Sequence, residues 1–342
     1  MTELAPKNDQ AVLPFASVGL AENWTTEPVA TFAAWRHTMK AANGYAYDPR
    51  SIKQHVAMWA TLVSYCESRG ANIVTLSPAL VESFFLQLRG RPVKNGQTSV
   101  RYAEGEMPEA TTSTRRRYAQ LLEQTFAYLV KTGIRRGNPI APLMKQLNKP
   151  EAPGFVSYLS KAEEDAFLAV VLATDETHWH DQRNKTLLLL LSASGITEGQ
   201  LVALKIADVS LDDFEPSLQV GERGLKHAHT TTINDFALPV LRRWVDSLAG
   251  VAADAPLFPS LPGSIHPMLA RDVYLTTRAA LEGSGFKGKQ RGPQTLRNSF
   301  IRRQIYFGID GVAIKGWAGL ESDRTLRKLR RTLPNTAGVR PA

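Results

Sequence analysis

The chain has 342 residues, of which 43% are hydrophobic, and carries a net charge of +9. This length can hold two ordinary hydrophobic cores, and the composition is not that of a disordered chain. The longest apolar run, residues 186–193, is too short to cross a bilayer, and no basic-then-apolar leader opens the sequence. We therefore expect a two-domain cytoplasmic protein without a membrane span. The single cysteine, Cys66, cannot form an internal disulfide, and its apolar setting predicts a buried thiol.

The first part of the chain has apolar residues at helical spacing. They predict four helices, over residues 28–42, 48–70, 76–88 and 114–133. In the second, Asp48 is expected to cap the helix and Pro49 to lie in its first turn. We expect a helical N-terminal domain over residues 23–140, preceded by a flexible N-terminus over residues 1–22.

Residues 141–157 contain three prolines together with lysine, asparagine and glycine, a composition typical of a linker. The C-terminal domain is then expected over residues 158–342. Ser160 with Glu163, and Thr197 with Gln200, have the spacing of capping boxes and predict helix starts. Residues 217–220 and 230–233, separated by a glycine-rich turn, predict a small hairpin.

Positive charge is concentrated near the C-terminus. Residues 286–342 contain 13 Lys or Arg and three Asp or Glu, whereas the rest of the chain is nearly neutral. Such a block on helices predicts a surface that neutralises phosphates, and the alternative is a solvated, charge-rich helix face.

Four successive segments, taken together, are similar to one known family. They read LSKAEEDAFLAVV, LLLLLSASGITEGQLVALKIADVSL, the hairpin followed by LPVLRRWV, and APLFPS. Their order resembles the tyrosine recombinases (phage integrases) across about residues 24–333. The resemblance implies a mainly α fold, with a helical, SAM-like core-binding domain and a catalytic-fold domain that is helical with a small hairpin or sheet. It also implies DNA recombination or integration as the family's reaction.

That reaction needs residue types that this chain largely lacks. In the family a tyrosine attacks the DNA phosphorus, arginines stabilise the developing oxyanion, and histidine and lysine transfer protons. By this resemblance, Arg297 is the one catalytic arginine of the family that the chain keeps. The other family positions are replaced, at Thr197 (arginine), Gln294 and Leu320 (histidines) and Leu329 (tyrosine).

No tyrosine follows Tyr306, which we expect to be core or domain-facing rather than catalytic. We therefore expect a pseudo-enzyme that binds double-stranded DNA without cutting it. It would act as a regulator or architectural factor on a mobile element or plasmid, associated with the nucleoid.

Two alternatives remain open. One is a divergent, active recombinase with a displaced nucleophile or a partner subunit that supplies one. The other is a protein-interaction scaffold.

The DNA contacts are expected on basic helices. Residues 111–117, TTSTRRR, open the helix that the family places against the major groove. The hairpin lysine of the family corresponds best to Lys226. The full set of expected contact residues is Lys53, Arg115, Arg116, Arg117, Arg223, Lys226, Arg297, Arg302, Arg303 and Arg324. For each of them the alternative is an ordinary solvent-exposed or intramolecularly paired side chain.

Leu326, Leu329 and Leu333 form an apolar stripe on the last basic helix. The stripe predicts an interface with a second copy or a recombinase partner, and burial in its own domain is the alternative. No cofactor motif is present, and the histidine pairs 178/180 and 227/229 lack metal-ligand spacing. We expect neither a cofactor nor a metal.

Overall fold

The computed structural model describes residues 22–40, 44, 46–89, 109–147, 156–212, 214–221 and 228–333. The chain divides into two compact units, Met1–Glu151 and Ala152–Ala342. The described residues are mainly helical and include one three-stranded sheet, as the sequence predicts. No helix among these residues has the length and apolar character needed to span a membrane. The predicted flexible N-terminus lies almost wholly outside the described residues.

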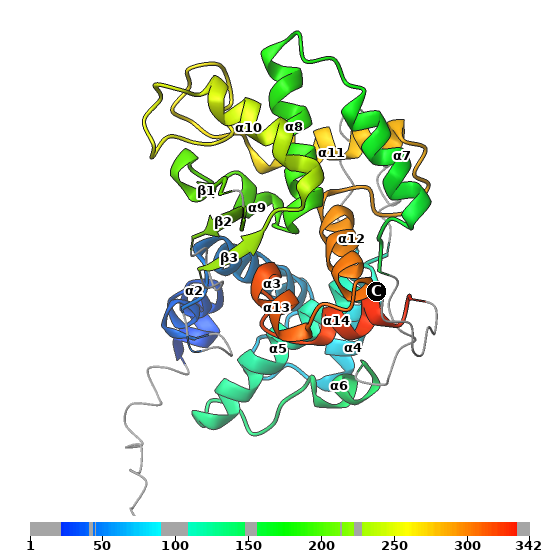
Figure 1. Cartoon of the computed structure of the whole chain (residues 1–342). Coiled ribbons are helices and arrows are strands. Elements are labelled where there is room, and N and C mark those ends of the chain that lie inside the picture. The colour runs from blue at the N-terminus through cyan, green and yellow to red at the C-terminus, as the bar shows by residue number, and fades with distance from the viewer. Residues whose placement is uncertain are drawn as a thin grey trace, which may run out of the picture. The chain divides into compact units, whose positions relative to one another are not determined.

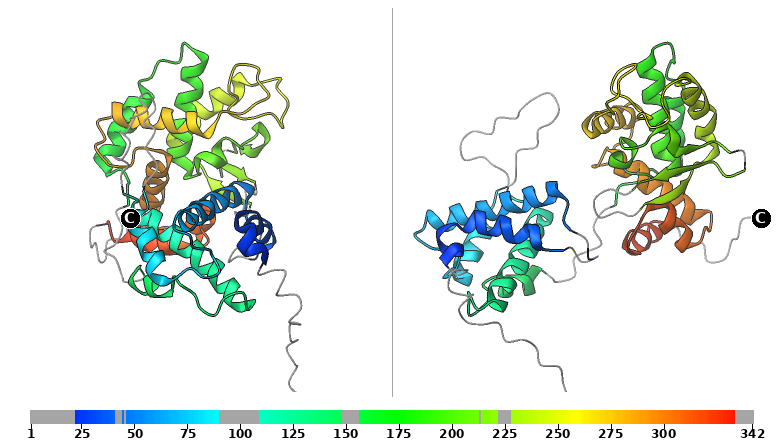
Figure 2. Two further views of the ribbon diagram at one scale, coloured as in Figure 1. Left: turned by 180° about the vertical axis from the view of Figure 1, so that it is seen from behind. Right: turned by 90° about the vertical axis from the view of Figure 1, so that its left-hand side faces the viewer.

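The first unit is built from helices (Figure 2). Aromatic side chains make up much of its core. Its helices include α2 (Pro28–Thr38), α3 (Pro49–Glu67), α4 (Pro78–Gln87), α5 (Thr112–Lys131) and α6 (Ala141–Leu147). The Asp48 side chain accepts a hydrogen bond from the Arg50 amide and caps α3, with Pro49 in the first turn, as expected. Trp59 on α3 is fully buried and stacks on Phe32 of α2, with ring centroids 4.9 Å apart. Cys66 is also buried, and burial raises the pKa of its thiol to about 11.

Helix α6 corrects the predicted linker, because residues 141–147 are helical. Pro142 occupies the first turn, where a missing amide hydrogen costs nothing. Leu143 and Met144 pack against the core of the first unit, which explains why a proline-containing segment stays ordered there.

The second unit has several helices that pack against one buried helix, α8 (Trp179–Ser194) (Figure 1). Its helices are α7 (Lys161–Leu172), α8 (Trp179–Ser194), α9 (Glu198–Leu201), α10 (Leu238–Ser247), α11 (Ala270–Gly283), α12 (Pro293–Tyr306), α13 (Gly311–Ala318) and α14 (Arg324–Arg330). Five successive leucines of α8, Leu187–Leu191, are buried, and α8 contacts α7, α10, α11 and α12. A helix with apolar residues on all sides is stable only when covered in this way.

The sheet lies in the second unit and has the strand order β1-β2-β3, with antiparallel pairing. Its strands are β1 (Val209–Ser210), β2 (Ser217–Val220) and β3 (His229–Thr232). The hairpin predicted from the sequence is confirmed as β2 and β3, and Leu218 faces Thr231 in their register.

A small apolar core joins the last three helices. Phe300 and Ile301 of α12 pack with Ile314 and Ala318 of α13 and with two leucines of α14, Leu326 and Leu329. Leu329 is fully buried and Leu326 is 6% exposed, so the prediction of an interface stripe is wrong for both. The alternative holds instead: these leucines are buried in their own unit. Leu333 is only partly buried and ends the described chain.

Candidate functional site

The one family arginine that the chain keeps, Arg297, is buried in the second unit. Its side chain lies on α12 and the residue is 4% exposed. Its two terminal nitrogens donate to the carbonyl oxygens of Gly195 and Ala318. Burial lowers the pKa of the guanidinium to about 10, so the group remains charged at neutral pH.

Both carbonyls that receive Arg297 lie where a helix ends. Gly195 is the C-cap of α8, and Ala318 is the last residue of α13, followed by the C-cap Gly319. Helix C-termini carry unsatisfied carbonyls and partial negative charge, which favour a nearby cation. Arg297 therefore ties two helix ends together, although its remaining N–H groups have capacity for further bonds.

The two C-cap glycines are required by space as well as by backbone angle. Gly195 has φ of 64° and Gly319 has φ of 54°, in the left-handed region. A Cβ on Gly195 would lie 2.3 Å from Phe300 Cδ1. A Cβ on Gly319 would lie 2.5 Å from His229 Cε1. The imidazole of His229 on β3 therefore lies directly against the segment that precedes Leu320.

Thr197, at the position of the family's first arginine, has a structural role. Its hydroxyl accepts a hydrogen bond from the Gln200 amide at 3.2 Å, and Gln200 Oε1 accepts from the Thr197 amide at 2.8 Å. This reciprocal pair is the capping box predicted from the sequence, and it begins α9. A neutral hydroxyl used in this way supplies no positive charge.

The three remaining family positions also carry no proton-transfer group. Gln294 is exposed and donates to Asn298 Oδ1 at 2.8 Å, and Asn298 in turn donates to the Ser157 carbonyl at 2.8 Å. Leu320 packs against the small core of the last helices, and Leu329 is inside that core. None of these side chains titrates near neutral pH.

Tyr306 is not part of the core, because it is 60% exposed. It follows Arg297 by nine positions on α12. Nine helical residues make 2.5 turns and about 13 Å of rise, so the two side chains leave the helix on opposite faces. Tyr306 is therefore not placed beside the Arg297 guanidinium.

Arg302 and Arg303 both have partners within the second unit. The Arg303 guanidinium pairs with Glu164 of α7 and donates to the Ser192 carbonyl at 2.7 Å. Arg302 lies over the Tyr158 ring, 4.7 Å from its centroid, and donates to the Thr332 hydroxyl at 3.2 Å. The prediction that Arg303 contacts DNA is not supported, because its guanidinium is paired with the Glu164 carboxylate inside the second unit.

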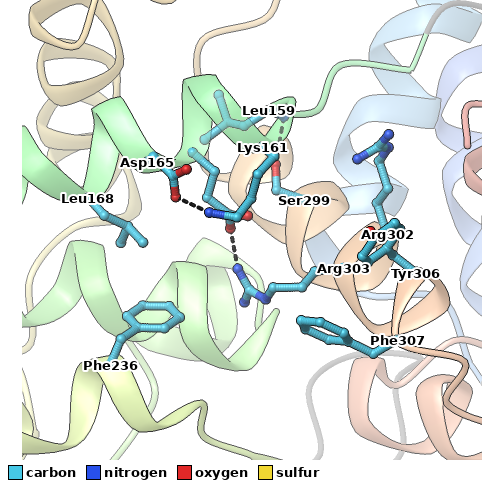
Figure 3. A pocket seen from close by; sticks show the side chains of 11 residues that line it. Leu159, Lys161, Asp165, Leu168, Phe236, Ser299, Arg302, Arg303, Tyr306 and Phe307 are labelled. Atoms are coloured by element: carbon cyan, nitrogen blue, oxygen red, sulfur yellow. Dashed lines mark hydrogen bonds and ion pairs between the residues drawn. The ribbon is translucent and has the colours of Figure 1, made fainter. Parts of the chain in front are cut away.

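The Arg303–Glu164 pair lines a cavity of about 430 Å³ between α7 and α12 (Figure 3). Burial raises the pKa of Glu164, and the Arg303 charge acts in the opposite direction. Tyr306 and Phe307 also line this cavity, and both are more than half exposed.

The expected DNA contacts of the first unit lie on two neighbouring helices. Lys53 on α3 and Arg117 at the start of α5 are exposed, and Arg117 donates to Gln54 Oε1 at 2.6 Å. Arg115 pairs with Glu109 at 3.0 Å. Arg116 lies between these two arginines and is half-buried. The Thr111 hydroxyl accepts from the Thr114 amide, which confirms the predicted helix start.

The other expected contacts belong to the second unit. Arg324 is exposed at the start of α14 in the second unit. Arg223 and Lys226 lie outside the described residues, so their assignment stays a prediction.

Comparisons with known proteins identify the fold. No protein-family model matches the chain, and no curated protein matches its sequence. The XerH site-specific recombinase bound to palindromic difH substrate is 17% identical, with a TM-score of 0.67 over 93% of this chain and 84% of that chain. The Tn1549 transposon integrase in complex with circular intermediate DNA is 14% identical, with a TM-score of 0.63 over 88% and 94%. The chain therefore has the tyrosine recombinase fold.

Sequence reasoning missed the internal partners of this site. The contact between His229 and Gly319 and the bonds of Arg297 join residues far apart in the chain. The glycine after a helical pattern, at positions 195 and 319, was the one local signal, because it marks a helix end.

Proposed function

We propose that the chain is a double-stranded DNA-binding protein with a tyrosine recombinase fold that does not cleave DNA. It acts as a regulator or architectural factor on a mobile element or plasmid. One observation supports the loss of cleavage: the position of the family's nucleophile, Leu329, is a fully buried leucine. An acyl- or phosphoryl-transfer site without a nucleophile and a proton-transfer group has little residual activity.

The role of Arg297 follows from its surroundings. Both terminal nitrogens donate to helix-end carbonyls and the residue is almost completely buried. We expect it to hold α8 and α13 together rather than to clamp a phosphate. The arginine is then retained because removing it would leave buried carbonyls without donors.

DNA binding is supported by charge that remains at the surface. Lys53 and Arg117 are exposed on neighbouring helices of the first unit, and Arg324, Arg327 and Arg330 are exposed on α14. Each phosphate that such a group neutralises releases counterions, so affinity falls steeply with salt. Distributed contacts of this kind do not depend on any catalytic atom.

The test is a salt titration of the full chain with a fluorescent duplex, followed by anisotropy. We expect the logarithm of the binding constant to fall linearly with the logarithm of salt concentration. Lys53→Gln and Arg324→Gln should each reduce the slope by about 1.

Arg136→Gln is the matched control for this titration. Arg136 is an exposed arginine just beyond the far end of α5, which has 20 residues and so spans about 30 Å. No duplex binding at low salt would refute the proposal and favour a protein-interaction scaffold. Sequencing the DNA that crosslinks to the chain in cells then identifies its site.

A further inference from the structure

The first unit contains a small polar cavity that no part of the proposed function explains. It has a volume of about 200 Å³ and is lined by side chains of α2, α3 and α5 and of the segment before α3. The polar lining residues are Arg36, Tyr47, His55, Arg117, Gln120 and Gln124. Pockets for drug-sized ligands are about 300–1,000 Å³, so this cavity fits only a small group.

Arg36 is a buried cation whose recorded partners are neutral. It is 2% exposed, and its guanidinium carbon lies 4.0 Å from the centroid of the Tyr47 ring. Its Nε donates to His55 Nδ1 at 3.1 Å and a terminal nitrogen donates to Gln124 Oε1 at 3.2 Å. The ion pairs found among the described residues do not include Arg36. A buried charge without a counter-ion is costly, and an anion bound in the cavity beside Arg36 would offset that cost.

The hydrogen-bonding groups of the cavity also favour an anion. His55 Nδ1 accepts from Arg36, so in the neutral ring Nε2 carries the proton and donates. Burial, and then the charges of Arg36 and Arg117, lower the pKa of His55 to about 4, so the ring is neutral at neutral pH. Gln124 Oε1 is occupied by Arg36, which leaves its amide nitrogen as a donor. The lining therefore offers two positive charges and several donors, and none of the described lining residues is acidic.

The arrangement also selects among anions. The donors come from three helices, Arg36 from α2, His55 from α3 and Arg117 from α5, and so approach from several directions. A carboxylate has two oxygens in one plane and suits a single guanidinium fork, whereas a tetrahedral phosphate presents oxygens in all directions.

We propose that the cavity between Arg36, His55 and Arg117 binds a phosphate group. The phosphate is either part of a DNA backbone or free in solution. In the first case the inference rests on the proposed function, because Arg117 also belongs to the expected DNA face with Lys53. In the second case the cavity is a regulatory site for a small phosphate compound.

The experiment uses the full chain in chloride buffer at low ionic strength, and its first arm is calorimetric titration with inorganic phosphate. Two variants alter the exposed mouth of the cavity: Arg117→Gln removes a charge and Gln120→Glu adds a carboxylate. Gln87→Glu adds the same charge on α4, outside the cavity, and is the matched control. Circular dichroism melting verifies that each variant is folded. We expect saturable binding of one phosphate that weakens at least tenfold in both cavity variants and not in the control.

The second arm measures duplex affinity of the same proteins as a function of salt. If the phosphate belongs to DNA, both cavity variants lower the affinity, Arg117→Gln reduces the salt slope by about 1, and inorganic phosphate competes with the duplex. Loss of this DNA contact supports the proposal even when free phosphate does not bind detectably.

Saturable phosphate binding by a chain that does not bind duplex supports the free-phosphate source and refutes the proposed function alone. Duplex binding that is equal in all proteins, together with no phosphate binding, overturns the cavity inference and leaves the proposed function intact.

Discussion

Replacing Arg297 tests whether this arginine holds two helices together or binds a DNA phosphate. The guanidinium donates to the carbonyls of Gly195 and Ala318, so Arg297→Ala leaves both oxygens without this donor. A hydrogen bond to a charged group contributes about 1.5–3 kcal/mol, which gives about 3–6 kcal/mol for two. Truncation also removes two buried methylenes, at about 0.8 kcal/mol each.

Removal of the buried charge has the opposite effect on stability. Burial lowers the pKa of Arg297 to about 10, well below the usual value for arginine. At about 1.4 kcal/mol per pKa unit, burying the Arg297 charge costs roughly 3 kcal/mol, and a neutral side chain avoids this cost. The net loss for Arg297→Ala is therefore about 2–5 kcal/mol. Arg297→Met keeps most of the apolar contact and should lose less, about 2 kcal/mol.

The assay combines thermal unfolding with duplex affinity. For a unit of about 190 residues, the loss in Arg297→Ala lowers the unfolding temperature on the order of 10 °C. Arg324→Met, at an exposed position, serves as the control and should melt like the parent chain. At a temperature where Arg297→Met is folded, its duplex affinity should match the parent within about twofold. A tenfold loss of affinity with an unchanged unfolding temperature would show that Arg297 is a clamp.

Three further substitutions or conditions test the local structure. Thr197→Ala removes the cap of α9 and should cost about 1 kcal/mol in urea unfolding, whereas Thr197→Ser should cost little; equal stability of all three proteins would contradict the cap. Gly195→Ala forces a left-handed residue and a contact with Phe300, and should lower the unfolding free energy by about 2–4 kcal/mol; a loss below about 1 kcal/mol would contradict the packing. His55 has a folded pKa of about 4 against 6.5 when unfolded, so the unfolded chain binds more protons between these values. Stability of the first unit is therefore full above about pH 6.5 and falls by at most about 3 kcal/mol as the pH drops to 4. Hydrogen exchange in α3 measures this loss, which should be absent in His55→Gln.

Local signals in the sequence predicted the helix starts and the hairpin. The capping boxes at Ser160 and Thr197 depend on residues three positions apart, and the hairpin depends on two short strands and a turn. Such features are decided within a few residues. Helix α6 was missed because the prolines in and after it are typical of a linker, and only the packing of Leu143 and Met144 shows that the segment is helical.

The partners of charged and apolar side chains could not be predicted in the same way. Arg303 pairs with Glu164, 139 residues away, and Arg297 bonds to Gly195, 102 residues away. An amphipathic stripe such as Leu326 and Leu329 shows which face is buried but not which surface covers it. Long-range packing decides these questions. It is the reason that Arg297 and Arg303, expected to contact DNA, and Leu326 and Leu329, expected at an interface, have partners inside the second unit.

The absence of strand cleavage is the central claim, and a suicide substrate tests it most directly. The duplex carries the site recovered from cells and a nick that traps any covalent intermediate. The full chain should shift this duplex in a native gel, and denaturing detergent should release all of it. A detergent-resistant adduct, mapped by mass spectrometry to Tyr306 or to a serine or threonine of the chain, would contradict the account.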